Sequence, residues 1–289
     1  VAVSVPKWDS STCIQCNQCS FVCPHATIRP YALTDEEIAA APENLVAIPM
    51  KGKLKDTFRY TLAISPLDCM GCGVCVGVCP TDSLSMVGAE GELAEQDVFD
   101  YCVAEVADKP EVQDNSVKGS QFKQPLLEFS GSCAGCAETS YARLVTQLFG
   151  DRMFISNATG CSSIWGGPAA TSPYTVNKEG RGPAWANSLF EDNAEHGYGM
   201  LQGHTAVRQM VIEQTEQLLA AGVPEDAVAA AQAWLDARDD STASKDASAA
   251  YAVELEKLAE GEGDAAALAA RILANKDYLA KKSIWIFGG

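Results

Sequence analysis

Eight of the twelve cysteines follow one repeated pattern that suits iron–sulfur chemistry. The pattern C-x2-C-x2-C-x3-C-P occurs twice, and its cysteines are Cys13, Cys16, Cys19, Cys23, Cys69, Cys72, Cys75 and Cys79. Two residues between thiolates let one short loop hold three corners of a [4Fe–4S] cluster, whereas the cysteine before proline ligates the other cluster. The spacing therefore predicts two clusters with crossed ligation. Cys79 completes the first group of three cysteines, and Cys23 completes the second.

Zinc sites and disulfides are the alternatives for these eight cysteines. Zinc modules use two CxxC halves rather than three closely spaced cysteines and a Cys-Pro. Disulfide scaffolds are short chains whose cysteines are spread through loops. Gly71, Gly73 and Gly77 are expected to let the backbone approach the sulfide atoms and donate N–H bonds. His25, directly after Cys23-Pro24, could tune a cluster, but packing at the surface is the favoured interpretation.

Three of the other four cysteines lie in the middle of the chain. Cys133 and Cys136 form CAGC within SGSCAGCAETS, and Cys161 follows in NATGCSSIWGG. Three thiols are one short of a cubane, and the fourth ligand is expected to lie outside this chain. Cys102 stands in a helical pattern and is interpreted as a buried free thiol. A thioredoxin-like redox pair is the alternative for CAGC, although that motif normally follows a strand and has an aromatic residue or proline nearby.

The composition is that of a folded protein and argues against nucleic-acid binding. The chain has 289 residues, of which 47% are apolar and 20% charged, enough for about two domains. Its net charge of -17 leaves little room for the basic face that DNA or RNA requires. No apolar run reaches the roughly 18 residues that span a bilayer, and no secretory signal opens the sequence, so a cytoplasmic protein is expected. The missing initiator Met and the Gly-Gly end suggest a piece of a longer chain.

The elements that must position these cysteines begin with a predicted ferredoxin-like α+β domain over residues 1–105. Residues 30–66 are an insertion in that domain, with a short helix in LTDEEIAAA and a strand in TFRYTLAI. Such a module forms mainly around its clusters, because two short cysteine loops bury little apolar surface. Residues 106–126 are polar and contain Pro, Gly, Asn and Ser, which predicts a linker.

From residue 127 the pattern changes to that of an α/β domain with a mostly parallel sheet. LLEF is an apolar strand, a helix over AETSYARLVTQLF stops at Gly150, and a strand covers DRMFIS. A helix over 204–221 ends at Gly222, and KKSIWIFGG is a closing strand. Ligands of such sheets gather at the carboxyl ends of the strands, where CAGC and the Gly288-Gly289 end are expected. Residues 224–282 predict an acidic surface excursion of two or three solvated helices, broken at DDSTASKD and EGEGD.

Several of these segments together resemble pyruvate:ferredoxin (flavodoxin) oxidoreductase, the single-chain type that depends on thiamine diphosphate. The resemblance covers nearly the whole chain. It rests on the double cysteine module with its insertion, SGSCAGCAET, GCSSIWGG, SPYTVNKEGRGPAWANSLFEDNAEHGYGM and IWIFGG. It implies an internal section of that enzyme, in which residues 127–289 are the first part of an α/β domain that binds thiamine diphosphate.

The resemblance also implies a third [4Fe–4S] cluster, held by Cys133, Cys136 and Cys161 beside the thiamine diphosphate. It implies that Glu138 contacts this cofactor and that Cys136 and Cys161 lie on its side of the cluster. From the residues alone, Glu138 is a carboxylate at a helix N-terminus, where the helix dipole stabilises it. His196 and His204 are interpreted as structural. No catalytic residue is assigned.

The chain departs from the family's pattern at its end. The family's thiamine motif begins Gly-Asp-Gly, and its Asp and a later Asn bind Mg2+; this chain stops at Gly289, where that Asp would follow. The Mg2+ ligands, the fourth cysteine of the third cluster and the domains that bind pyruvate and coenzyme A are therefore expected in other sections of the enzyme.

The implied enzyme oxidatively decarboxylates pyruvate with coenzyme A to acetyl-CoA and CO2, and passes electrons through three clusters to ferredoxin or flavodoxin. Its partners are the remaining sections of the same enzyme, in a homodimer. Another 2-oxoacid:ferredoxin oxidoreductase and a non-catalytic electron-transfer module are the alternatives. Lys51, Lys53 and Lys55 alternate along an expected strand, where they form a docking patch for an acidic carrier or protect a sheet edge from aggregation.

Overall fold

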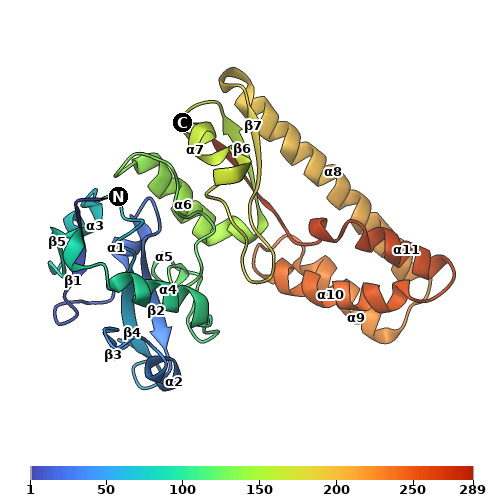
Figure 1. Ribbon diagram of the computed structural model, residues 1–289. Coiled ribbons are helices and arrows are strands. Elements are labelled where there is room, and N and C mark those ends of the chain that lie inside the picture. Colours follow the sequence, from blue (N-terminus) through green and yellow to red (C-terminus); the bar gives the residue numbers. More distant parts are fainter. Residues whose placement is uncertain (1, 289) are drawn as a thin grey trace. The chain divides into compact units, whose positions relative to one another are not determined.

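The computed structural model describes residues 2–288, which form two compact units (Figure 1). The first unit contains the chain up to Asp151 together with Thr159–Pro183, and the second contains Arg152–Ala158 and Ala184–Gly288. This division follows spatial contacts, so the domain limits expected from the sequence remain a prediction about the full-length enzyme. Gly289, after which the thiamine motif would continue, lies outside the described residues.

The two cysteine loops of the first unit share one backbone conformation. Strands β1 (Ser4–Trp8) and β5 (Leu84–Gly88) pair antiparallel, and the loops carry the short helices α1 (Gln18–Phe21) and α3 (Val74–Gly77). Three equivalent positions of the repeats have left-handed φ angles: 59° and 67° at Gln15 and Gly71, 61° and 73° at Asn17 and Gly73, and 55° and 52° at Ala26 and Asp82. The sequence repeat is therefore a conformational repeat, and glycine at 71 and 73 adopts it without a steric penalty.

The insertion forms an antiparallel sheet in the order β2 (Ile28–Leu33), β4 (Arg59–Ile64), β3 (Ile48–Pro49). Helix α2 (Asp35–Ala39) and strand β4 confirm the helix and the strand predicted here. Helix α4 (Glu95–Glu105) packs on β4, and Leu33, Ala63, Phe99 and Cys102 form the apolar core between them.

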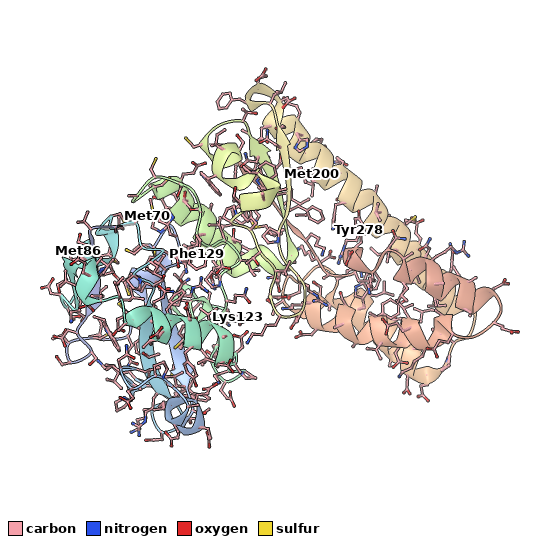
Figure 2. The ribbon with its side chains drawn as sticks, viewed as in Figure 1. Met70, Met86, Lys123, Phe129, Met200 and Tyr278 are labelled. Atoms are coloured by element: carbon pink, nitrogen blue, oxygen red, sulfur yellow. The ribbon has the colours of Figure 1, made fainter. Side chains whose placement is uncertain are left out.

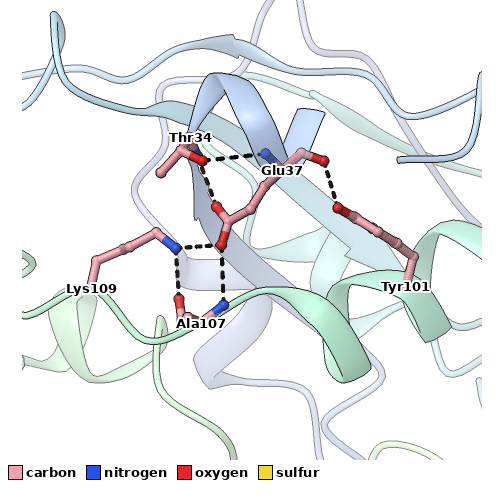
Figure 3. Close-up of polar contacts among 5 residues, drawn as sticks. All are labelled: Thr34, Glu37, Tyr101, Ala107 and Lys109. Atoms are coloured by element: carbon pink, nitrogen blue, oxygen red, sulfur yellow. Dashed lines mark hydrogen bonds and ion pairs between the residues drawn. The ribbon is translucent and has the colours of Figure 1, made fainter. Parts of the chain in front are cut away.

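Glu37 ties α2 to the end of α4 (Figure 3). Its carboxylate accepts hydrogen bonds from the Thr34 N–H at 2.8 Å, the Ala107 N–H at 3.2 Å and the Lys109 ammonium at 2.5 Å. Tyr101 donates its hydroxyl to the Glu37 carbonyl oxygen at 2.5 Å. Burial alone would raise the pKa of Glu37, but these hydrogen bonds to its carboxylate outweigh burial and hold the pKa below its usual value.

Residues 106–126, expected as a linker, pack against the cysteine loops through helix α5 (Val117–Ser120) and the residues after it. The buried Gln121 accepts a hydrogen bond from the Ser20 hydroxyl at 3.0 Å. The ring of Phe122 meets Tyr60 edge-on, with 6.1 Å between the ring centroids. Within this predicted linker, Gln121 satisfies a polar group of the first cysteine loop.

The rest of the first unit contains α6 (Ala137–Phe149), which confirms the predicted helix, and α7 (Cys161–Gly166). LLEF is not a strand: within the described part of the chain, Leu127 makes only an isolated bridge to Tyr174, so CAGC does not follow a sheet strand. Gly150 is not a left-handed stop either, because its φ is -57°. An added Cβ there would lie 2.9 Å from Cδ1 of Leu126, so close packing explains this glycine.

The second unit contains a parallel sheet in the order β7 (Ala184–Ser188), β6 (Met153–Ala158), β8 (Ser283–Phe287). Strands β6 and β8 and their parallel arrangement confirm the prediction. Helix α8 (Asn193–Ala220) packs against this sheet and begins earlier than expected. Gly197 permits the approach, because an added Cβ would lie 2.5 Å from Cγ1 of Ile286.

Helices α9 (Glu225–Ala237), α10 (Ala243–Ala259) and α11 (Asp264–Leu273) confirm three helices and both predicted breaks. They are not merely solvated, because they enclose a core with the C-terminal part of α8 (Figure 1). Trp234 and Tyr251 are fully buried there and stack with 5.6 Å between ring centroids. Short 3-10 turns lie at Ala89–Gly91, Gly150–Arg152, Ala169–Thr171, Phe190–Asp192 and Lys276–Tyr278. Among the described helices, none combines the length and apolar character needed to traverse a membrane.

Glu37→Gln should lower the free energy of unfolding by about 1–3 kcal/mol at pH 7, the usual effect of losing hydrogen bonds to a charged group. Because the folded-state pKa is lowered, the contribution is present above the unfolded pKa and is lost as the pH falls through the folded pKa, so it should persist at pH 5. Thermal unfolding of the iron-loaded chain measures it. Asp35→Asn, which removes an exposed carboxylate from the same helical turn, is the control. Equal effects of the two substitutions would contradict the role of the Glu37 contacts.

Candidate metal centres

The first group of cysteines lines one pocket. Cys13, Cys16 and Cys19 come from the first loop, and Cys79 comes from the end of the second loop. Trp8, Ile14, Tyr60, Leu62 and Leu84 supply the apolar part of the wall. Four thiolates around an apolar hollow are what a [4Fe–4S] cluster needs. The fourth cysteine of this group is Cys79, as crossed ligation requires.

The second group is recognised by the electrostatic effect that its thiolates have on one another. Burial first, and then the charges of Cys23, Cys72 and Cys69, raise the pKa of Cys75 to about 12. The pKa of Cys69 is also raised, by burial first and then by Cys23 and Cys72. Cys23, from the end of the first loop, therefore lies among the three cysteines of the second loop.

Backbone N–H groups point at several of these sulfurs. The N–H groups of Gln15 and Gly71, which occupy equivalent left-handed positions, donate to Sγ of Cys13 at 3.4 Å and of Cys69 at 3.3 Å. Ser83 N–H donates to Sγ of Cys79 at 3.2 Å. Such N–H···S bonds tune the potential of a cluster. The repeat conformation thus directs the same donor at the first cysteine of each loop.

The geometry differs from that of a single-ion site. Within residues 2–288, no three His, Cys, Asp or Glu side chains converge so as to hold one metal ion. Zinc draws four ligands to a common centre, whereas the thiolates around a cluster bind separate irons at its corners. The spacing of the cysteines in the two loops is that of cluster ligands.

The CAGC loop lies against the second cysteine loop. Gly135 has a φ of 72°, and an added Cβ there would lie 3.4 Å from Cβ of Cys72 and 3.5 Å from Cγ2 of Val74. Cys136 precedes the first residue of α6, and Cys161 is the first residue of α7. Both segments belong to the first unit, and a cluster shared by Cys133, Cys136 and Cys161 remains a prediction.

Cys102 is fully buried in the apolar core between α4 and the insertion sheet, as a free structural thiol would be. Burial raises its pKa to about 12, and the nearby carboxylate of Glu37 acts in the same direction. Its neighbours in that core are Leu33, Ala63 and Phe99, away from both groups of cysteines.

One face of α6 attaches the CAGC segment to the first cysteine loop. Ser140 donates its hydroxyl to the carbonyl oxygen of Val22 at 2.9 Å, and Arg143 donates from Nη1 to that of Ser20 at 2.7 Å. Because these side chains follow Cys136 at helical spacing, they continue its face of the helix. The helix therefore fixes the CAGC loop relative to both groups of cysteines.

Glu138 is half-buried, and one of its carboxylate oxygens belongs to a set of buried polar atoms that have no hydrogen-bond partner among the described residues. Its Oε1 is buried without a hydrogen-bond partner among the described residues, as are the Tyr174 hydroxyl and the Trp165 indole N–H. The rings of Trp165 and Tyr174 lie 6.1 Å apart, and Glu138 together with burial raises the pKa of Tyr174. Unsatisfied buried polar groups call for a ligand, so these residues fit a bound polar cofactor. Sequence reasoning missed Tyr174 and Trp165, although both lie in the segments that carry the resemblance.

The three histidines are structural in different ways. His25 is not at the surface as expected: it is 2% exposed, and its Nδ1 lies 2.9 Å from the carbonyl oxygen of Ser130. Nδ1 of His196 lies 2.7 Å from the Ser156 hydroxyl oxygen. His204 packs against Phe154 and against Tyr278, which Figure 2 labels. Burial, with Arg208 and Lys282, lowers the pKa of His204 to about 4, so it is neutral at physiological pH.

Paired substitutions distinguish crossed from uncrossed ligation. With crossed ligation, Cys13→Ala combined with Cys79→Ala disables one cluster and should remove about four irons, whereas Cys13→Ala combined with Cys23→Ala should remove about eight. Iron analysis of the purified chains measures this. The reverse result, with the larger loss in the Cys13/Cys79 variant, would show that each loop holds its own cluster.

Comparisons with known proteins agree with this picture. Residues 12–83 match the family model described as a 4Fe-4S dicluster domain. The whole chain is 48% identical to the pyruvate-flavodoxin oxidoreductase of Klebsiella pneumoniae and covers 24% of it. It is 49% identical to the pyruvate:ferredoxin oxidoreductase of Moorella thermoacetica, covering 25%, and 43% identical to the mitochondrial pyruvate dehydrogenase (NADP+) of Euglena gracilis, covering 16%. The resemblance inferred from the motifs is confirmed. The chain is thus homologous, over its full length, to a section that makes up about a quarter of the pyruvate:ferredoxin and pyruvate:flavodoxin oxidoreductases.

Proposed function

We propose that this chain is the electron-transfer section of an oxidoreductase, joined to the first part of its thiamine-diphosphate domain. The intact enzyme converts pyruvate and coenzyme A to acetyl-CoA and CO2 and reduces ferredoxin or flavodoxin. The observation that carries the proposal is the crossed arrangement of two cysteine groups in a chain about half identical to these enzymes throughout. The relatives named above all carry pyruvate in their names, which favours pyruvate over another 2-oxoacid.

The order of the three cysteine groups suggests an electron route. The clusters supply one-electron chemistry and thiamine diphosphate supplies carbanion chemistry when they are bound. Gly135 of the CAGC loop lies against Cys72 of the second group, and Cys75 of that group acts electrostatically on Cys19 of the first. From these contacts we infer that the second group lies between CAGC and the first group. We infer transfer from the Cys133, Cys136 and Cys161 site through the second group to the first.

The lysine segment supports an exit at the first group. Lys51, Lys53 and Lys55 lie in a turn before β4 rather than on a strand, and all three are exposed. Lys51 donates from Nζ to the carbonyl oxygen of Cys13 at 3.0 Å, beside Ile14, which is 43% exposed. This places positive charge at the rim of the first pocket, where an acidic carrier would approach. The alternative, that these lysines protect a strand edge from aggregation, requires them to lie on the edge strand, and they do not.

Glu138 is the proposed contact of this chain with thiamine diphosphate, with Cys136 and Cys161 nearby. The unpartnered oxygen of Glu138 and the hydroxyl of Tyr174 supply polar groups that the cofactor would satisfy. The Mg2+ ligands and the fourth cysteine would come from other sections of the enzyme. A homodimer in the cytoplasm remains the expected setting.

Cys133→Ala in the full-length enzyme separates catalysis from simple electron carriage. Loss of a ligand from the first cluster in the route should abolish reduction of the ferredoxin-type clusters by pyruvate and coenzyme A. Dithionite should still reduce those clusters, because their own eight ligands are intact. Electron paramagnetic resonance after each reductant measures the difference, and Cys102→Ala is the control. Undiminished pyruvate-driven reduction in Cys133→Ala would contradict the proposed route.

Charge reversal tests the exit. Replacing Lys51, Lys53 and Lys55 with Glu should lower the association rate with ferredoxin at low salt and flatten its salt dependence, because rim charges act mainly on association. Stopped-flow kinetics of the full-length enzyme measures both. The control makes the same change at three other exposed lysines, Lys178, Lys257 and Lys276. Equal effects of the two triple variants would assign the change to net charge and exclude docking at this turn.

A further inference from the structure

Arg143, on α6, is a buried cation that forms no ion pair within the described part of the chain. It is 1% exposed, and its Nη1 donates to the carbonyl oxygen of Ser20 at 2.7 Å and to Oε1 of Gln121 at 3.0 Å. Its Nε and Nη2 are buried without a partner among the described residues. Burial lowers the pKa of Arg143 to about 10, so the guanidinium still carries its charge at neutral pH.

Arg29 provides a comparison within the same unit. It is also buried, but it forms an ion pair with Glu128 at 2.5 Å, and its guanidinium lies over the rings of Phe99 and Phe129. Figure 2 labels Phe129. Glu128 is therefore committed to Arg29 and acts on Arg143 less than Cys23 and Cys19 do, so that Arg143 has no ion pair among the described residues. Burying such a charge is costly unless an anion lies close to it.

Arg143 binds the chain segment that carries two of the predicted cluster ligands. Ser20, which it binds, lies in the segment between Cys19 of the first group and Cys23 of the second. The thiolates of Cys23 and, more weakly, Cys19 act on the guanidinium in the direction that favours its charge. Ser140, one turn earlier on α6, holds the carbonyl oxygen of Val22 and fixes this geometry.

We propose that Arg143 is the fixed counter-cation of the two ferredoxin-type clusters and raises their reduction potentials. This inference rests on the proposed function. A cluster with four thiolates carries net negative charge, which grows by one when it accepts an electron. A cation held in a medium of low dielectric constant stabilises the reduced form more than the oxidised form.

The position of Arg143 on α6 bears on the direction of electron transfer. α6 begins directly after Cys136 and carries Arg143 two turns later, so one helix joins the proposed third cluster to the cation that acts on the second. A raised potential at the second cluster favours the arrival of electrons from the CAGC side. Arg143 is thus a tuning residue, which contacts the cysteine segment and acts on the electron acceptor through its charge.

A redox titration of the full-length, iron-loaded enzyme, followed by electron paramagnetic resonance, tests the proposal. In Arg143→Gln, the ratio of reduced to oxidised second cluster at a fixed potential should fall at least about tenfold, which is 59 mV for a one-electron couple. Arg143→Lys keeps the charge and should keep most of the wild-type ratio. Arg59→Gln, which removes an exposed cation from β4, is the control and should leave the ratio unchanged. Equal potentials in Arg143→Gln and wild type would overturn the proposal.

A second measurement covers poor cluster assembly. If Arg143→Gln holds too little iron for titration, release of iron to a chelator is compared between Arg143→Lys and Arg143→Gln. Faster release from the Gln variant follows from the lost charge, whereas equally fast release from both would give Arg143 a packing role and refute the proposal. A wild-type enzyme without ferredoxin-type clusters would overturn the proposed function itself, which the iron content reveals before any variant is made.

Discussion

The repulsion among buried thiolates is the constraint on which the first unit depends. Eight cysteines from two short loops lie in two groups, where burial and mutual charge raise the pKa of Cys19, Cys69 and Cys75. Iron must displace the protons that these raised pKa values retain, and its binding then also contributes folding energy to this module. Both loops position their cysteines with the same backbone conformation, because three left-handed positions recur in each repeat.

Crossed ligation makes the two loops interdependent, and the residues around them keep this arrangement in place. Gln15 links the first loop to the insertion sheet, since its side chain accepts from Lys51 N–H at 2.7 Å and donates to the Pro49 carbonyl oxygen at 2.9 Å. On the other side, α6 holds the segment between Cys19 and Cys23. The insertion and α6 thus support the pair of loops from two sides. Each of them also carries a segment with a proposed function. The insertion contains the lysine turn, and α6 begins directly after CAGC.

Much of the site was predictable because its signal is local. Cysteine spacing depends on the geometry of one short loop, and the strands β6 and β8 and the helices α6 and α9–α11 follow from periodicity and breakers. Long-range features escaped prediction. Nothing near Arg143 in the sequence distinguishes a buried cation from a surface one, and the polar residues 106–126 gave no sign that Gln121 meets Ser20. The lysines alternate like a strand, but Gly52, with a φ of 94°, turns the chain there. The helix does end before Gly150 as predicted, but the reason for glycine there is close packing against Leu126, which a local rule cannot detect.

The central claim is that Cys23 and Cys79 exchange partners between the two loops. The most direct measurement is the location of the iron atoms, by anomalous X-ray scattering, in crystals of the full-length, iron-loaded enzyme. The account predicts two iron groups in this section, with Sγ of Cys79 bonded to iron beside Cys13, Cys16 and Cys19, and Sγ of Cys23 bonded to iron in the other group. Bonding of Cys79 to the iron group held by Cys69, Cys72 and Cys75 would contradict it.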